Sequence, residues 1–600
     1  MAVLRFENLT GDPSLDWMGR ALSEMLASGA AGSKETWVIP LGTLRGGEAV
    51  LGPRPVSAPG ISAERTEALL AGADRLVYGE YSLVHGRLRV AASVEDPGSG
   101  RMLRTADTAG RSPDDLPGAA TALALRLGLL AGPFATPNPA AWRHYSEGLE
   151  ERDPAASLRH FKLATEADHS FGQAWRAAIA TAARTDPAAA RELLERARAA
   201  RASMTSTERA RLDLELAGYR GDRAGQKAAF TALAAADPAD PGPYRGLAAL
   251  AQSEHDYAAA AALLRKASTL HPDDPALLNT LGYAEAWAGN LPGAAAALRR
   301  YGQVRPDDPN ALDSLGDVHL YLGKPAEAGR FYQDAYAKDP SFQDGGSLLK
   351  AAFASLIAGD PGRAGTIFER YIEGRRAAAD PFIEYRRAEW LWLTGERRPA
   401  LQKLSVFAAA TEKTAAHELA ARAHAHMAVW SLELGDAAGA RGHAEKAQAL
   451  SGPASGGIAA VARFLTLPPA SASEWRVRAE RTFFSPQAAG MKQFAVAYAL
   501  LFGREFQGAT PLLKEAYARW TPMGDPAVPV LLAWAYAETG RAREAAPLVE
   551  HTPVPQGAGL NLFTSLWFPR LFAVRAQVLE AQGRKDEAAR QRRQFLELAR

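Results

Sequence analysis

Four histidines between residues 417 and 443 form the densest group of metal-capable side chains in the sequence: His417, His424, His426 and His443. On a helix, His417 and His424 lie seven residues apart and share one face, whereas His424 and His426 diverge by about 200°. Zinc motifs such as HExxH add a carboxylate at helical spacing. No carboxylate completes this group at such a spacing. We therefore predict packed or solvated histidines here, with no metal site and no cofactor.

Other patterns for catalysis are equally absent from the sequence. It contains no cysteine, which excludes thiolate nucleophiles, disulfides and cysteine-type metal sites. The nucleophile elbow G-x-S-x-G, the P-loop and the kinase motifs do not occur. Two glycine-rich stretches, Arg45-Gly46-Gly47 and Gly98-Ser99-Gly100, do not join a strand to a helix in a phosphate-binding pattern. The sequence therefore predicts a protein that is not an enzyme.

The bulk composition predicts neither nucleic-acid binding nor a membrane span. Lysine and arginine total 69 against 67 acidic residues, which leaves a formal net charge of +2 over 600 residues. So balanced a chain is not strongly attracted to nucleic acid or to an anionic membrane. No stretch reaches the roughly 18–20 apolar residues that a spanning helix needs. A chain of this length exceeds a single core, so several domains or a repeat array are expected.

Any binding residues must be positioned by helical hairpins, because the stretch from Asp274 to Pro340 consists of two similar halves in tandem. Small residues in each half allow two antiparallel helices to approach closely. A glycine between the helices permits a positive φ, and a proline ends the second helix. The recurring pairs, all at one constant spacing, are Leu278/Leu312, Leu281/Leu315, Gly282/Gly316, Gly289/Gly323, Ala294/Ala328, Leu298/Tyr332 and Pro306/Pro340.

This pattern resembles the tetratricopeptide repeat, which places W-x2-L-G-x2-Y, alanine and proline within a unit of about 34 residues. Weaker copies continue in both directions, so we assign residues 141–600 to the array and expect a degenerate unit at residues 452–484. The resemblance implies an all-α superhelical solenoid. Its concave groove would be lined mainly by the first helix of each hairpin.

The resemblance also implies which side chains face the groove. Aromatic side chains with a few polar groups suit a protein or peptide partner. The alternative is that Tyr283, Trp287 and Trp392 pack against the next repeat. The predicted partner-binding residues are Arg245, Asn279, Tyr283, Trp287, Asp313, Asp317, Tyr321, Tyr385, Glu389 and Trp392.

Residues 1–132 have a different pattern, which predicts a small α/β (α+β) domain. Its expected helices are Asp16–Ala27, Ser62–Ala71 and Asp115–Leu129, and its expected strands are Ala2–Phe6, Trp37–Leu41, Leu76–Val84, Arg87–Val94 and Met102–Ala109. Residues 133–140, rich in proline, form the predicted linker. The positions of Phe6, Asn8, Trp17, Gly19, Gly72, Ala73 and Gly79 resemble the N-terminal domain of TolB and its relatives. That resemblance implies a fold and no function of its own.

Two functions stay open at this point. The first is a non-catalytic scaffold that binds a protein or peptide in the groove. The alternative is a sensory or regulatory segment of a bacterial signalling protein, such as a kinase, cyclase or transcription regulator, whose effector domain lies outside this chain. A strand that starts at residue 2 motivates this second hypothesis. We expect a cytoplasmic protein, or a periplasmic one if a leader or anchor precedes this chain, and the oligomeric state is unknown.

Overall fold

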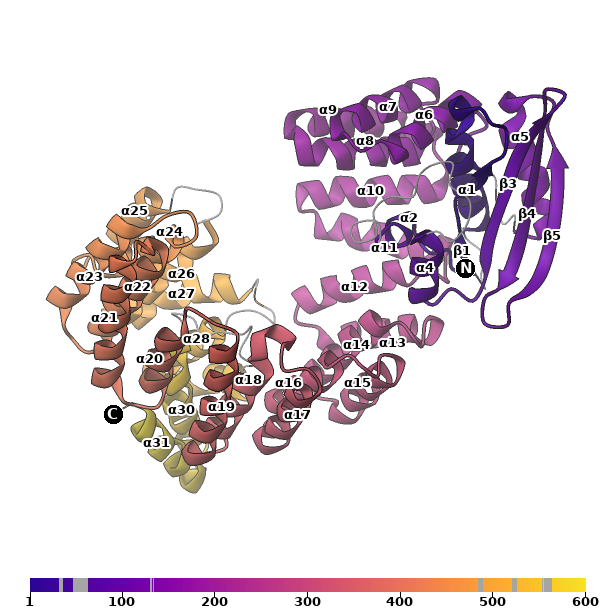
Figure 1. Ribbon diagram of the computed structural model, residues 1–600. Helices are drawn as coiled ribbons and strands as arrows, with labels where there is room; N and C mark the ends of the chain where they lie inside the picture. Colours follow the sequence, from indigo (N-terminus) through magenta and orange to yellow (C-terminus); the bar gives the residue numbers. More distant parts are fainter. Residues whose placement is uncertain are drawn as a thin grey trace. The chain divides into compact units, whose positions relative to one another are not determined.

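The computed structural model describes residues 1–31, 36–46, 63–129, 132, 134–483, 489–518, 520, 526–552, 554 and 564–599 (Figure 1). The predicted features at Gly47, Ser62, Pro133 and Phe484 lie outside these residues. The chain forms two compact units. The first unit comprises Met1–Ala251 and Ala259–Leu277, and the second comprises Gln252–Ala258 and Leu278–Arg600. None of the described helices is both long enough and apolar enough to cross a membrane.

The first unit begins with a small mixed sheet. Its strands are β1 (Ala2–Val3), β2 (Glu7–Asn8), β3 (Leu76–Val84), β4 (Arg87–Asp96) and β5 (Arg101–Ala109). The strand order is β1-β3-β4-β5, with β2 also paired to β3. The first two strands run parallel to β3, whereas β3, β4 and β5 form an antiparallel meander. The meander confirms the three strands predicted after residue 75.

The predicted second strand at Trp37–Leu41 is wrong, because residues 36–40 have no regular secondary structure. Two backbone hydrogen bonds hold the segment beside the start of the chain. The Met1 ammonium donates to the Trp37 carbonyl over 3.0 Å, and the Ile39 N–H donates to the Met1 carbonyl over 2.9 Å. Pro40 has no N–H to extend a ladder, and a short helix begins at Leu41.

Helices accompany the sheet and share its core with the first hairpins. Figure 1 shows α1 and α5 beside the strands and α6 next to α1. One hydrophobic core runs from Met1 to Leu216 and includes residues on both sides of the predicted linker. The domain limits at residues 132 and 141 stay a prediction. The helices of this part are α1 (Trp17–Ala30), α2 (Leu41–Leu44), α4 (Ala63–Leu70) and α5 (Leu116–Leu127), with 3-10 turns at Pro13–Leu15 and Pro113–Asp115.

From residue 139 onward the described chain is helical, in consecutive antiparallel pairs. The earlier helices are α6 (Pro139–Glu150), α7 (Pro154–Ala167), α8 (Gly172–Thr185), α9 (Pro187–Ala200), α10 (Ser206–Arg220), α11 (Arg223–Ala236), α12 (Pro241–Ser253), α13 (Tyr257–Leu270), α14 (Pro275–Trp287), α15 (Leu291–Val304), α16 (Asn310–Tyr321) and α17 (Pro325–Lys338). The later helices are α18 (Gly346–Ile357), α19 (Pro361–Ala377), α20 (Ile383–Leu393), α21 (Arg397–Lys413), α22 (His417–Glu433), α23 (Ala437–Leu450), α24 (Gly456–Leu465), α25 (Ala472–Thr482), α26 (Ala489–Phe502), α27 (Phe506–Tyr517), α28 (Ala527–Glu538), α29 (Ala542–Val549), α30 (Thr564–Ala581) and α31 (Lys585–Leu598). The unit expected to be degenerate thus forms the short pair α24/α25.

The hairpins follow from the residues of the repeat. Gly289 and Gly323 have φ angles of 80° and 75°, which glycine adopts without a Cβ penalty. A Cβ added to Gly282 would lie 2.5 Å from the Leu298 side chain, so a small residue there lets α14 and α15 approach. The Asn290 side chain accepts a hydrogen bond from the backbone of α15 and caps its start. These contacts confirm the predicted roles of the small residues and of the turn glycines.

In the second unit the last helices pack onto earlier ones. The Phe353 ring on α18 lies 4.4 Å from the Phe568 ring on α30. The Gln594 amide on α31 donates to the carbonyl of Leu356 over 2.8 Å. Figure 1 shows α28, α30 and α31 beside α18, α19 and α20. One large apolar core extends from Leu320 to Leu598, so this stretch buries helices against one another that are far apart in sequence.

Candidate partner-binding surface

Half of the predicted groove residues are buried. Asp313, Asp317, Tyr385, Glu389 and Trp392 are each at most 5% exposed. They lie on α16 and α20, the first helices of their hairpins, as expected. These five side chains are not exposed in a groove, because neighbouring helices of the second unit cover each of them, and for Trp392 this agrees with the alternative of packing against the next repeat. The reason differs between the two helices.

On α16, two aspartates bind a lysine of the next hairpin. Lys350 on α18 donates to Asp313 Oδ2 over 2.7 Å and to Asp317 Oδ1 over 3.0 Å. Ser347 donates to the other Asp313 oxygen over 2.6 Å. Burial opposes the charge of Lys350, but Asp317 and Asp313 outweigh it and raise the lysine pKa. The lysine therefore stays protonated and neutralises part of a buried acidic pair.

Two tyrosines complete this buried network. The Tyr283 hydroxyl donates to Asp317 Oδ2 over 2.7 Å and to Ser314 Oγ over 3.1 Å. Tyr332 donates to Asp317 Oδ1 over 2.8 Å. Burial raises the pKa of both phenols, and the charge of Asp317 adds to this. Together these groups satisfy the carboxylate of Asp317, which is why an acid can lie inside the array. We define the buried network as Tyr283, Asp313, Asp317, Tyr332, Ser347 and Lys350.

On α20, the polar groups contact α22 of the next hairpin. The Tyr385 hydroxyl shares a hydrogen bond of 2.6 Å with Nδ1 of His426. Burial lowers the pKa of His426 to about 4. Burial also raises the pKa of Glu389, whose Oε1 lies 3.6 Å from Nε2 of His426. Trp392 stacks on Trp430 with ring centroids 4.5 Å apart.

The histidine group expected near α22 is held by hydrogen bonds. His424 uses both ring nitrogens: Nδ1 lies 3.1 Å from Nδ1 of His443, and Nε2 lies 2.8 Å from a Glu412 oxygen. Burial lowers the pKa of His424 and of His443. His426 is fully enclosed beside Tyr385. The prediction of packed histidines is thus confirmed for these three side chains.

A second set of side chains in the same unit is only half-buried and is strongly aromatic. Three of its members, Tyr283, Trp287 and Tyr321, belong to the predicted groove. We define the aromatic cluster as His255, Tyr257, Tyr283, Trp287, Tyr321, Tyr517, Trp520 and His551. Six of its rings lie in a chain of contacts, and the rings of Tyr321 and His551 form a separate stacked pair. The centroid separations range from 4.4 to 6.0 Å. Tyrosine and tryptophan in such clusters are enriched among residues that dominate protein interfaces.

The cluster is assembled from three distant stretches of sequence. The imidazole of His255 hydrogen-bonds through Nε2 to the Trp520 carbonyl over 2.8 Å. The Thr552 N–H donates to the Tyr321 carbonyl over 3.1 Å, which places His551 in a stack 4.4 Å from the Tyr321 ring. Two connectors late in the chain thus return to the α12/α13 turn and to the end of α16. Local sequence gives no sign of this return.

The aromatic cluster combines uncharged rings with acidic neighbours in sequence and with one half-buried cation, Arg575, whose Nη2 donates to the His551 carbonyl over 3.0 Å. Burial raises the pKa of Tyr257, Tyr321 and Tyr517, so all three phenols stay neutral at physiological pH. Tyr257 and Tyr517 also raise the pKa of Tyr321, because the three phenols lie near one another. The residues next to the cluster histidines in sequence include the exposed carboxylates Glu254, Asp256 and Glu550.

The two remaining predicted residues lie outside both groups. Arg245 is exposed and has its guanidinium 4.0 Å from a carboxylate oxygen of Asp274. Asn279 belongs to the second unit and is half-buried. Its Oδ1 is shielded from solvent and has no hydrogen-bond partner within the part of the chain that the structure describes. Arg245 belongs to the first unit, whereas the aromatic cluster belongs to the second.

One protein-family model matches a part of the helical array. A model of the tetratricopeptide repeat matches residues 251–316. No curated protein matches the chain. Among solved structures, the chain is similar to the crystal structure of PilW, a widely conserved type IV pilus biogenesis factor. The two sequences are 19% identical, the match covers 34% of this chain and 96% of that chain, and the TM-score is 0.29.

Two further solved structures have similar values. MamA residues 41 to the end, from Desulfovibrio magneticus RS-1, is 18% identical over 29% of this chain and 96% of that chain, with a TM-score of 0.25. YrrB, whose structure is described as a tetratricopeptide-repeat protein with an unusual peptide-binding site, is 16% identical over 29% and 87%, with a TM-score of 0.24. These scores are too low to support a functional comparison. The match to the tetratricopeptide-repeat family thus covers residues 251–316, and helical hairpins with the same kind of turn continue on both sides of it.

Proposed function

We propose that this protein is a non-catalytic scaffold that binds a protein or peptide partner, and that the aromatic cluster is its contact surface. The observation that carries the proposal is the convergence of eight half-buried rings from three stretches of the second unit. Stacked helical repeats create extended binding surfaces, and aromatic side chains supply large contact areas at a low entropic cost.

The same cluster favours a particular class of ligand. Its phenols are neutral, and the adjacent exposed side chains Glu254, Asp256 and Glu550 are acidic. A peptide that combines an aromatic or aliphatic residue with a lysine or arginine complements both features. Such a cation would also interact favourably with the faces of the rings. We therefore expect the preferred peptides to be basic and apolar rather than acidic.

The buried network supports the choice of the aromatic cluster over the other predicted residues. A side chain that is at most 5% exposed cannot contact a partner unless the hairpins separate. Asp313 and Asp317 also have their hydrogen bonds filled by Lys350, Ser347 and two tyrosines. Tyr283 links the two sets, because its hydroxyl belongs to the network and its ring contacts Trp287 at 5.8 Å.

A displayed peptide library selected on the full chain tests this proposal. Peptides enriched on the wild type are synthesised, and their affinity is measured on Trp287→Gln and on Tyr321→Gln. We expect each substitution to weaken binding by at least about tenfold, as for residues near the centre of an interface. The enriched sequences should carry basic residues.

Tyr219→Gln is the matched control, because Tyr219 is an exposed tyrosine of the first unit. It should leave the affinity unchanged. Peptides that bind the wild type and both cluster variants equally well would contradict the proposed surface. A library that yields no binder at micromolar concentrations would contradict the proposed function itself.

A further inference from the structure

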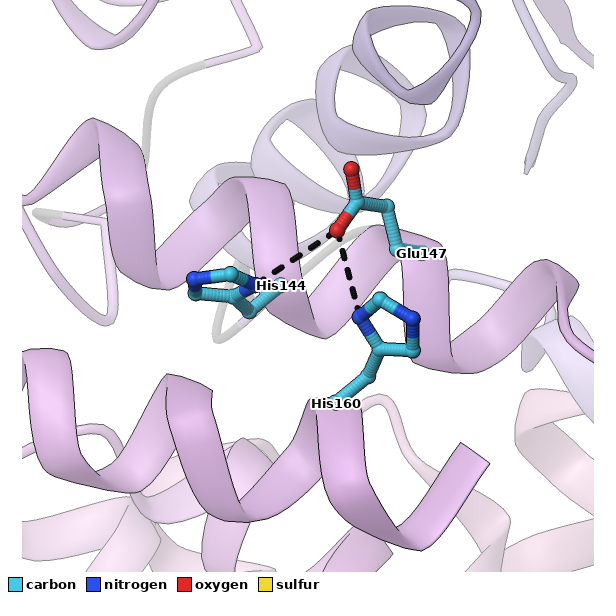
Figure 2. A group of neighbouring side chains, drawn as sticks. All are labelled: His144, Glu147 and His160. Atoms are coloured by element: carbon cyan, nitrogen blue, oxygen red, sulfur yellow. Dashed lines mark ion pairs between the residues drawn. The ribbon is translucent and has the colours of Figure 1, made fainter. Parts of the chain in front are cut away.

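A second group of chemically capable side chains lies in the first unit, at the first hairpin. His144 and Glu147 are three residues apart on α6 and share a face of that helix, and His160 projects toward them from α7 (Figure 2). This group was not among the predicted sites, because the second histidine follows on the other helix of a hairpin. The sequence signal that could have revealed it is a histidine followed one helical turn later by a glutamate, with a second histidine on the next helix.

Close packing of α6 and α7 brings the three residues together. Gly148 follows Glu147, and a Cβ added there would lie 2.7 Å from the Phe161 ring and 3.2 Å from Cβ of His160. The Ser157 hydroxyl donates to the Gly148 carbonyl over 2.7 Å and ties the two helices at the same level. Glycine at position 148 is thus what lets His160 reach the face of α6.

The ligand atoms of this group face one another. Nδ1 of His144 lies 3.4 Å and Nδ1 of His160 lies 3.2 Å from the same oxygen, Oε2 of Glu147. One ligand atom of each of the three residues lies within 4.8 Å of the other two. Both nitrogens are shielded from solvent, and neither has a hydrogen-bond partner among the residues that the structure describes. Shielded polar atoms without partners are uncommon, and they indicate a group that can fill the space between them.

The separations match a particular coordination geometry. A tetrahedral zinc ion with bonds of about 2.05 Å to nitrogen and oxygen separates its ligand atoms by about 3.3 Å. The two measured nitrogen–oxygen distances, 3.4 Å and 3.2 Å, lie on either side of that value. Calcium and magnesium prefer sites built from oxygen alone, whereas imidazole suits zinc and its neighbours among the transition metals.

The surroundings of the group also suit an ion. The Arg143 guanidinium donates from Nε to the other oxygen of Glu147 over 2.9 Å, and so turns Oε2 toward the imidazoles. The three side chains are 31%, 24% and 32% exposed although the two ligand nitrogens are shielded, so the site lies near the surface, where an incoming ion can bring a water molecule as its remaining ligand. Arg143 is therefore a positioning residue for the carboxylate.

We propose that His144 Nδ1, Glu147 Oε2 and His160 Nδ1 bind a divalent transition-metal ion, with Zn²⁺ as the best fit, and that a water molecule occupies the fourth position. The ion joins α6 to α7 and stabilises the first hairpin. Because the folded protein presents the ligands together and the unfolded chain does not, bound zinc should raise the unfolding temperature.

Calorimetric titration of the chelator-treated full chain with Zn²⁺ alone tests the site. We expect about one ion per chain at this site, with affinity reduced at least about tenfold in His144→Gln and in His160→Gln. Glu147→Gln keeps the shape of the side chain and should weaken binding as well. Arg143→Met should weaken it by a smaller factor. Zinc should raise the unfolding temperature of the wild type and not that of the histidine variants.

Two control variants separate this site from other histidines. His169→Gln replaces an exposed histidine of the same unit, and His424→Gln replaces one of the hydrogen-bonded histidines near α22. Both should keep the wild-type affinity. A double variant His144→Gln/His160→Gln that binds Zn²⁺ as tightly as the wild type would overturn the proposal. So would a wild type that binds no zinc, since the geometry then reflects only ion pairs between the glutamate and the histidines.

Discussion

The predicted groove residues on helix α16 are buried toward one end of the helix and half-buried at the other. Asp313, Asp317 and Tyr321 lie four residues apart along α16, on one face of the helix. The two aspartates are buried against α18 and bound to Lys350, whereas the Tyr321 ring is half-buried and stacks on His551. The same stripe therefore serves packing along most of its length, and we propose that a partner binds only where α16 ends.

Of the variants described below, removal of Lys350 should lower the free energy of unfolding most. Lys350→Met leaves two carboxylates buried without their cation, which costs about 3–5 kcal/mol of unfolding free energy. Chemical denaturation followed by circular dichroism measures the loss. Lys403→Met is the control, because Lys403 forms its ion pair with Glu384 near the surface and should contribute less than about 1 kcal/mol. Equal losses in the two variants would show that the network is not what holds α16 to α18.

Low pH should have the next largest effect, because it lowers the folding stability that depends on the buried His426. The folded-state pKa of His426 is about 4, below its usual value of 6.5. Between these pH values the unfolded chain takes up a proton that the folded protein excludes, so the stability that is present above pH 6.5 falls by about 3 kcal/mol toward pH 4. Glu389 acts in the opposite direction, because its raised pKa favours the folded state at low pH.

A variant isolates the contribution of the histidine from that of Glu389. His426 faces Tyr385, Glu389 and Arg422. In His426→Gln the proton uptake disappears while the glutamate stays in place. The difference in unfolding free energy between wild type and variant should therefore shrink steadily from pH 7 to pH 4. A difference that stays constant over this range would contradict the low pKa of His426.

A smaller effect is expected for the hydroxyl of Tyr385. Tyr385→Phe removes one buried hydrogen bond of 2.6 Å to His426 and keeps the ring, so it should cost about 1–2 kcal/mol. The pKa of His426 should rise little or not at all in this variant, because burial is the main cause of its low value. Histidine resonances followed by NMR against pH would measure both the loss of the bond and the titration.

Much of the fold could be predicted from the sequence, because the repeat has local causes. Gly282 and Gly316 recur where the helices meet, and Gly289 and Gly323 recur where the chain turns. The failed strand at residues 37–41 shows the limit. Its apolar pattern suits a strand, but within the described part of the chain only two backbone hydrogen bonds form before Pro40.

The proposed contact surface was less predictable, for two reasons. Polar residues on the first helices have the spacing of a solvent-facing stripe. Hydrogen-bond partners one repeat away could nevertheless have indicated that these residues are buried. Tyr283 bonds to Asp317 at a separation of 34 residues, and Asp313 bonds to Ser347 at the same separation. The contributions of Trp520 and His551 had no such signal. They come from connectors, whose return to earlier hairpins no periodic pattern specifies.

The smallest effect on stability is expected in the aromatic cluster. Trp287→Gln removes ring contacts to Tyr257 and Tyr283 but leaves no buried charge, so it should cost about 1 kcal/mol. Thermal and chemical unfolding would place it well below Lys350→Met. A cost as large as that of the lysine would mean that the aromatic cluster is a structural core rather than a contact surface.

The most direct test of the central claim compares the aromatic cluster with a buried ring of the predicted groove in one binding experiment. The dissociation constant of a peptide selected on the wild type is measured for the double variant Trp287→Gln/Tyr321→Gln and for Trp392→Phe, which alters a buried ring stacked on Trp430. The double variant should bind at least about tenfold more weakly, and Trp392→Phe should bind as the wild type does. The account would be contradicted if the double variant kept the wild-type affinity, or if Trp392→Phe lost as much.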